Sequence, residues 1–130
     1  MKKDYDYIIC GGGASGLLLS NALISDRFFD DKKVLIIEKE AKVDNDKTFS
    51  FWDNQSNILD RIVFKSWEKA EFKDSEFSSS FNLSPYKYKM VRSDRFYSYM
   101  RKKIDRASNF TYLNATVKGI DKDSNHNNVK

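Results

Sequence analysis

The stretch IICGGGASG at residues 8–16 decides the fold of this chain. Its apolar residues lead into a G-x-G-x-x-G pattern formed by Gly11, Gly13 and Gly16, and the helix-like run LLLSNAL follows at once. The order strand, tight turn and helix is typical of a dinucleotide-binding unit. In such a unit Gly11 would permit the turn, Gly13 would let a pyrophosphate approach the backbone, and Gly16 would let the helix pack closely on the strand.

The start of this predicted helix supplies the groups that an anion needs. We expect the pyrophosphate to lie against free backbone N–H groups from Ala14 onward, because aligned peptide dipoles favour negative charge at a helix N-terminus. Ser15 is placed to add a hydroxyl there. The glycine pattern by itself does not choose between NAD and FAD.

An acidic residue at the expected distance completes the pattern. Glu38 ends a second apolar run, residues 34–37, and follows Gly16 by 22 residues. That is close to the spacing of roughly 20 expected for the acid that binds the ribose hydroxyls, and an acid there favours a ribose without phosphate. The alternative, a charge that merely ends a strand, is less favoured once strand, glycines and helix are taken together.

Composition limits the other classes of function. The chain has 130 residues, of which 40% are hydrophobic, which is room for one domain. Its net charge is +4, but residues 1–65 carry 10 basic and 11 acidic residues, so the excess lies in residues 66–130. Basic residues there alternate with acids, which favours a solvated surface and no nucleic-acid partner.

The numbers of cysteines and histidines argue against a disulfide-stabilised fold and against a metal site. A single cysteine, Cys10, cannot form an intramolecular disulfide, and we expect it to be a small buried residue. With His126 as the only histidine, the usual nitrogen and sulfur ligands of a metal site are missing. No run resembles a signal peptide or the roughly 18 apolar residues of a membrane span, so we expect a cytoplasmic location.

Periodicity extends the parallel unit to both ends of the chain. We expect strands at residues 5–10 and 34–37, joined by a helix at 14–25 whose apolar stripe is Ala14, Leu18 and Ala22. A second helix begins near Ser93, an expected N-cap, and buries Phe96, Met100 and Ile104. Residues 110–113 and 115–120 are strand material, and the later strand should lie parallel beside the first two.

The middle of the chain breaks this rhythm. Residues 39–47 carry no apolar period, 48–53 are predicted as an aromatic loop, and 57–63 as a short helix. Three antiparallel strands are predicted at 66–73, 76–83 and 86–91, with Tyr86, Tyr88 and Met90 on one face and solvated Lys87 and Lys89 on the other. The fold class is therefore α/β: a Rossmann-like βαβ unit over residues 1–120, with an inserted β segment at about 64–92 and a polar tail or loop at 121–130.

Four stretches resemble the lycopene cyclases of carotenoid synthesis, FAD-binding proteins related to flavin monooxygenases: residues 4–17, 26–39, 45–52 and 86–97. The aromatic TFSFW and the Y-x-Y strand leading into a D-x-F-Y helix are the most specific. The family typically has Arg where this chain has Lys47. The lysine keeps the positive charge but lacks the planar, forked guanidinium of arginine.

The resemblance implies an FAD-binding portion of a longer fold, whose carotenoid-binding region and catalytic acid lie beyond residue 130. FAD would be held by Gly11, Gly13, Ala14, Ser15, Gly16, Glu38 and Lys39. Reduced FAD, with NAD(P)H as a possible electron source, would support cyclisation of the linear end groups of lycopene to β-ionone rings without net redox change. The substrate dissolves in membranes, so peripheral association with the inner face of the cell membrane is expected. The catalytic residues are unknown.

Two other readings stay open. The chain could be a fragment of a generic FAD-dependent monooxygenase or oxidoreductase. It could also be a nucleotide-binding module without activity of its own, which would bind flavin without turnover.

Overall fold

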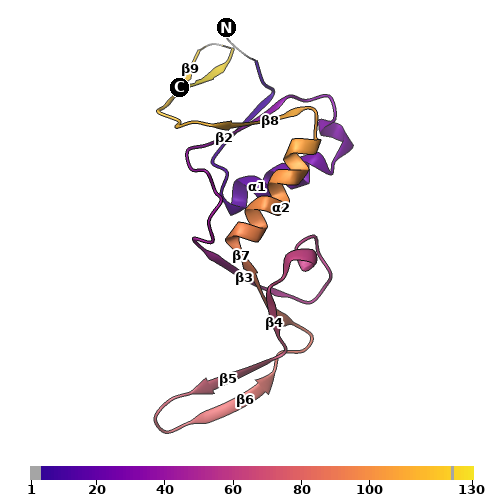
Figure 1. Cartoon of the computed structure of the whole chain (residues 1–130), viewed down its shortest axis with the longest axis vertical. Coiled ribbons are helices and arrows are strands. Elements are labelled where there is room, and N and C mark those ends of the chain that lie inside the picture. The colour runs from indigo at the N-terminus through magenta and orange to yellow at the C-terminus, as the bar shows by residue number, and fades with distance from the viewer. Residues whose placement is uncertain (1–3, 124) are drawn as a thin grey trace. The chain divides into compact units, whose positions relative to one another are not determined.

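A computed structural model describes residues 4–123 and 125–130 (Figure 1). Its contacts divide the chain into two compact units. The first comprises the residues up to Lys42 together with Tyr97–Lys130, and the second comprises Val43–Phe96.

The first unit is built on a parallel sheet. Its strands β1 (Tyr7–Cys10), β2 (Val34–Glu38) and β8 (Phe110–Asn114) lie in the order β1-β2-β8, and both neighbouring pairs are parallel. All five residues of β2 are buried, as expected for a central strand with continuous apolar sequence. The parallel pairing predicted for the strands at 5–10 and 34–37 is confirmed. The third parallel strand is β8, whereas residues 115–119, predicted as strand material, form no strand.

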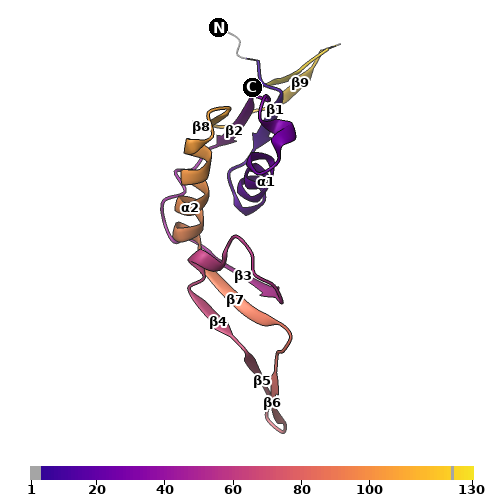
Figure 2. The same ribbon diagram turned by 90° about the vertical axis from the view of Figure 1, so that its right-hand side faces the viewer.

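Two helices pack against this sheet. Helix α1 (Ala14–Ile24) connects β1 to β2, and α2 (Ser93–Arg106) leads into β8. Figure 2 shows α1 and α2 side by side, and the Nζ atom of Lys103 donates a hydrogen bond of 2.8 Å to Oδ1 of Asn21. The predicted stripe of α2 is confirmed, because Phe96, Met100 and Ile104 are all at most 2% exposed.

The buried face of α1 differs from the prediction. Leu18 is 40% exposed and Ala22 is exposed, whereas Leu17, Ser20 and Asn21 are buried. The helix is apolar nearly all round, so periodicity could not choose a face. Its orientation is set by Gly16, which lies against the glycine turn, and Ser20 one turn later is carried to the same side.

Ser93, the predicted N-cap of the second helix, is the first residue of α2. It is fully buried, and its hydroxyl oxygen accepts a hydrogen bond of 3.0 Å from the amide of Lys47 while donating to Oδ1 of Asp46 at 2.9 Å. Its own amide reaches Oδ1 of Asn45. The serine therefore holds the loop at residues 45–47 against the start of α2. Local sequence cannot predict this contact, because the loop lies about 46 residues earlier in the chain.

The second unit holds two antiparallel sheets. Strands β3 (Thr48–Asp53), β7 (Lys87–Arg92) and β4 (Lys65–Trp67) form one sheet in the order β3-β7-β4, and β5 (Lys69–Lys73) pairs with β6 (Ser78–Asn82). Residues 48–53, predicted as a loop, are thus a strand whose exposure alternates along its length. Phe49 packs edge-on against Phe96 of α2, and the ring of Trp52 lies tilted against that of its cross-strand partner Tyr88.

Four further departures from the prediction concern the bounds and types of elements. The strand expected at 66–73 is divided into β4 and β5, and the helix expected at 57–63 is reduced to a 3₁₀ turn at Asp60–Ile62. A second 3₁₀ turn lies at Arg27–Phe29 within the expected loop. The last residues, predicted as a polar tail, instead form the antiparallel pair β9 (Ile120–Lys122) and β10 (Asn127–Val129). The Asp123 carboxylate accepts hydrogen bonds from the amides of Asn125 and His126, which lower its pKa to about 2.

Candidate dinucleotide site

The first glycine of the motif makes the turn between β1 and α1. Gly11 has φ +117°, a conformation that an L side chain rarely adopts, and its amide donates a hydrogen bond of 2.8 Å to the carbonyl of Ile37. The turn is therefore fixed to the end of β2.

The last glycine lets the helix approach the strand. A Cβ atom on Gly16 would lie 2.0 Å from the carbonyl oxygen of Gly11 and 3.3 Å from Cγ2 of Ile9. Because the first of these neighbours is backbone, only glycine fits without moving the helix. The role predicted for Gly16 is the one that the geometry shows.

The middle glycine faces open space. A Cβ atom on Gly13 would meet nothing within 4 Å, in contrast to Gly16. Gly13 is the N-cap of α1, no side chain of the described chain caps this helix, and the first bond within it runs from the amide of Leu17 to the carbonyl of Gly13. The amides of Ala14, Ser15 and Gly16 therefore precede the helical hydrogen-bond ladder, which is the arrangement that binds anions.

Glu38 is carried to this loop by the end of β2. Glu38 is 7% exposed. Its Oε2 atom accepts a hydrogen bond of 2.7 Å from the amide of Gly12, and its Oε1 atom accepts one of 2.9 Å from the amide of Glu40. Each carboxylate oxygen has a second lone pair, so the group can still accept hydrogen bonds from hydroxyl groups. The structure thus places Glu38 against the glycine loop, and its role toward a ribose stays a prediction.

Two residues near the site fall outside this arrangement. Lys39 is exposed, and within the described residues it makes no hydrogen bond or ion pair. Cys10, predicted to be buried, is exposed. The reason is that β1 lies at the edge of the parallel sheet and has β2 as its single neighbour among the described strands.

Sequence reasoning missed two contributors. A Cβ atom on Gly12 would lie 2.6 Å from the hydroxyl oxygen of Tyr112 and 2.9 Å from Cβ of Glu38, so this position also requires glycine. Tyr112 comes from β8, opposite Ile36, and the guanidinium carbon of Arg101 lies 3.9 Å from the centroid of its ring. The run of three glycines could have indicated Gly12. No local pattern indicates Tyr112, because it lies 74 residues after Glu38.

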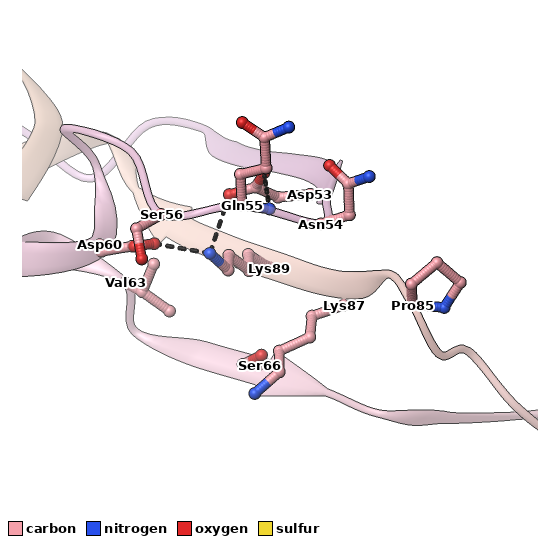
Figure 3. A pocket seen from close by; sticks show the side chains of 10 residues that line it. All are labelled: Asp53, Asn54, Gln55, Ser56, Asp60, Val63, Ser66, Pro85, Lys87 and Lys89. Atoms are coloured by element: carbon pink, nitrogen blue, oxygen red, sulfur yellow. Dashed lines mark hydrogen bonds and ion pairs between the residues drawn. The ribbon is translucent and has the colours of Figure 1, made fainter.

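The second unit contains a polar hollow of about 410 Å³ (Figure 3). At its wall the Nζ atom of Lys89 contacts Oδ2 of Asp53 at 2.9 Å and Oδ1 of Asp60 at 2.6 Å. These hydrogen bonds hold the pKa of both carboxyls below the usual range and raise that of Lys89. Lys89, predicted to be solvated, is therefore buried, because two aspartates neutralise it. Lys87 is exposed and pairs with Glu68.

No group of three or more His, Cys, Asp or Glu in the described part of the chain could hold a metal ion. Of the helices described there, none is long and apolar enough to cross a membrane.

Comparison with known proteins was made by sequence family and by structure. A family model described as "Lycopene cyclase protein" matches residues 6–130. The oxygen-dependent choline dehydrogenase of Staphylococcus aureus (strain JH9) is 36% identical over 67 residues, which are 52% of this chain and 10% of that protein.

Solved structures share the fold at low identity. The p-nitrophenol 4-monooxygenase PnpA from Pseudomonas putida DLL-E4 matches 99% of this chain with a TM-score of 0.76 and 16% identity. PqsL from Pseudomonas aeruginosa, "a probable FAD-dependent monooxygenase", matches 94% with a TM-score of 0.71 and 15% identity. The flavin-dependent brominase Bmp2 matches 96% with a TM-score of 0.68 and 18% identity. The chain spans about a third of each of these proteins, 36%, 36% and 35% respectively.

Proposed function

The chain belongs to the lycopene cyclase protein family, and from this we propose that it is the FAD-binding portion of an enzyme that cyclises the linear end groups of lycopene to β-ionone rings. The observation that carries the cofactor assignment is the joint placement of Gly13 and Glu38. An open glycine lies at an uncapped helix start, and a buried carboxylate lies against the amide of Gly12 in the same loop.

The residues present fit the adenosine half of FAD. In this proposal the amides of Ala14, Ser15 and Gly16 receive the pyrophosphate on the open side of Gly13, and the turn at Gly11 brings them to the carboxyl end of the sheet. Glu38 accepts the ribose hydroxyls with its remaining lone pairs. Lys39 is exposed beside it, and its positive charge favours the approach of the diphosphate.

The bound flavin, in its reduced form and with NAD(P)H as electron source, would supply an electron-rich ring system beside the reacting polyene. What this chain's own residues contribute is binding and orientation of the cofactor. A proton donor to the polyene is also required, and no carboxyl of the described residues is assigned that role here. Because lycopene dissolves in membranes, we place the enzyme in the cytoplasm with peripheral contact at the inner face of the cell membrane.

A second candidate is an FAD-dependent monooxygenase. PqsL is described as a probable FAD-dependent monooxygenase and PnpA as a p-nitrophenol 4-monooxygenase, and their shared fold covers nearly the whole chain. A third is a nucleotide-binding module without turnover. Conversion of lycopene with reduced FAD by the longest natural chain supports the cyclase. Oxidation of NAD(P)H stimulated by an aromatic substrate supports the monooxygenase, and flavin binding with neither reaction supports the module.

The cofactor assignment is tested by titrating the chain with FAD. Gly13→Val places a branched side chain where the pyrophosphate is proposed, and Glu38→Ala removes the ribose acceptor, so each should weaken binding. Gly119→Val is the matched control, because a Cβ atom there also meets nothing within 4 Å. Unchanged affinity in both site variants would mean that the nucleotide is misplaced.

A further inference from the structure

A tyrosine from the third strand of the parallel sheet reaches the glycine loop. Tyr112 lies in β8 opposite Ile36, on the same face of the sheet, and its hydroxyl oxygen lies 2.6 Å from the point that a Cβ atom of Gly12 would occupy. Cβ and Cγ of Glu38 lie 2.9 Å and 3.2 Å from the same point. The hydroxyl and the Glu38 side chain therefore pack together against one backbone position.

Tyr112 is itself held in place from helix α2. The guanidinium carbon of Arg101 lies 3.9 Å from the centroid of the tyrosine ring, a cation–π contact, and its Nε atom pairs with Oδ1 of Asp105 at 2.8 Å. The ring is thus fixed by a side chain that is itself anchored one turn further along the helix. The cation–π contact therefore favours the ring position in which the hydroxyl lies beside Gly12.

The hydroxyl keeps its proton in this setting. Burial, and then the charge of Glu38, raise the pKa of Tyr112 above its usual value of 10.0, while Arg101 opposes the shift. At neutral pH the group beside Glu38 is therefore a neutral phenol, which can face a carboxylate without charge repulsion.

We propose that Tyr112 is a positioning residue for Glu38: it keeps the carboxylate on the amide of Gly12 and so sets the preference of the site for a ribose with a free 2′-hydroxyl. This rests on the proposed function, in which Glu38 accepts the ribose hydroxyls. A glutamate side chain has several rotatable bonds, and holding it in one rotamer costs entropy unless neighbours confine it. The hydroxyl of Tyr112 and Cβ and Cγ of Glu38 crowd the same point beside Gly12, so the tyrosine limits the space open to the Glu38 side chain.

The test measures binding of ADP and 2′-deoxy-ADP to the whole chain by calorimetry. Both probes carry the diphosphate, and their affinity ratio reports the bond between Glu38 and the 2′-hydroxyl. In the unmodified chain ADP should bind roughly ten-fold more tightly, as expected for one hydrogen bond to a charged acceptor. Tyr112→Phe keeps the ring and its stack on Arg101, and it should weaken ADP several-fold while leaving 2′-deoxy-ADP nearly unchanged.

A matched control comes from the opposite end of the sheet. Tyr7 begins β1 and is 41% exposed, and Tyr7→Phe removes a hydroxyl of the same kind far from the carboxyl ends of the strands. Its affinity ratio should equal that of the unmodified chain. Should Tyr112→Phe lower the melting temperature too far for titration, Arg101→Met tests the same role, because it removes the cation–π contact that holds the tyrosine ring and leaves Gly12 and Glu38 unchanged.

The outcomes separate the two levels of the proposal. A ratio that persists in Tyr112→Phe, or an equal loss for both probes, overturns the positioning role and leaves the site intact. An unmodified chain that binds neither ADP nor FAD overturns the proposed function itself. A ratio that falls towards one in Tyr112→Phe or Arg101→Met, but not in Tyr7→Phe, supports the role.

Discussion

Replacing Gly16 by alanine should destabilise the first unit strongly. The added Cβ atom would lie 2.0 Å from the backbone oxygen of Gly11, whereas real Cβ contacts essentially never fall below 3.0 Å. Helix α1 and the turn must therefore separate by about 1 Å, a close-packing defect of the kind that costs typically 1–3 kcal/mol. Alanine returns up to about 1 kcal/mol through its better helix propensity. Since the obstructing atom is backbone and the turn is itself bonded to Ile37, we expect a net loss of about 2 kcal/mol.

The measurement is urea unfolding followed by far-ultraviolet circular dichroism. Tryptophan fluorescence is the complementary probe, because Trp52 and Trp67 both lie in the second unit and report its unfolding separately. Gly13→Ala is the control, since its Cβ atom meets nothing within 4 Å. It should leave the midpoint nearly unchanged while weakening FAD binding. A Gly16→Ala chain within about 0.5 kcal/mol of the unmodified one, the usual range of a neutral surface change, would refute this account of the glycine turn.

Three further substitutions test other parts of the chain. Gly11→Ala should lower the unfolding midpoint, because φ +117° strains any L side chain, whereas Gly119→Ala should not. Lys89→Met should destabilise the second unit, as two carboxylates lose their shared partner. Because the pKa values of Asp53 and Asp60 are lowered in the folded chain, the two carboxylates stabilise it at pH values above their ordinary pKa of 3.8. This stabilisation is lost as the pH falls through their folded pKa values. The urea midpoint should therefore fall less between pH 5 and 2 in Lys89→Met than in the unmodified chain. Asp123→Ala should speed amide exchange at Asn125 and His126, and the carboxyl of Asp123 should titrate at about 2 by NMR.

Much of the candidate site follows from sequence because its determinants are local. Gly11 and Gly16 are required by a positive φ and by a backbone contact five residues apart, and both features belong to one turn. Glu38 was predictable at a distance because a helix and a strand of ordinary length must intervene before the chain returns to the same edge of the sheet.

The parts that sequence missed depend on contacts between distant segments. Helix α1 is apolar on nearly every side, so its buried face was decided by the approach of Gly16 and not by its own pattern. Lys89 looks like a solvated residue on a strand until Asp53 and Asp60 are placed beside it by β3 and a 3₁₀ turn. From its sequence alone Tyr112 is indistinguishable from a core residue of a strand. The register of β8 against β2 brings its hydroxyl to Gly12.

Residue-resolved amide exchange in the presence and absence of FAD tests the central claim most directly. If the glycine loop holds the adenosine half of the cofactor, saturating FAD should slow exchange at the amides of Ala14, Ser15 and Gly16, and Glu38→Ala should reduce that protection. Protection confined to other segments, or none at these three amides when FAD is bound, would contradict the assignment of this loop as the dinucleotide site.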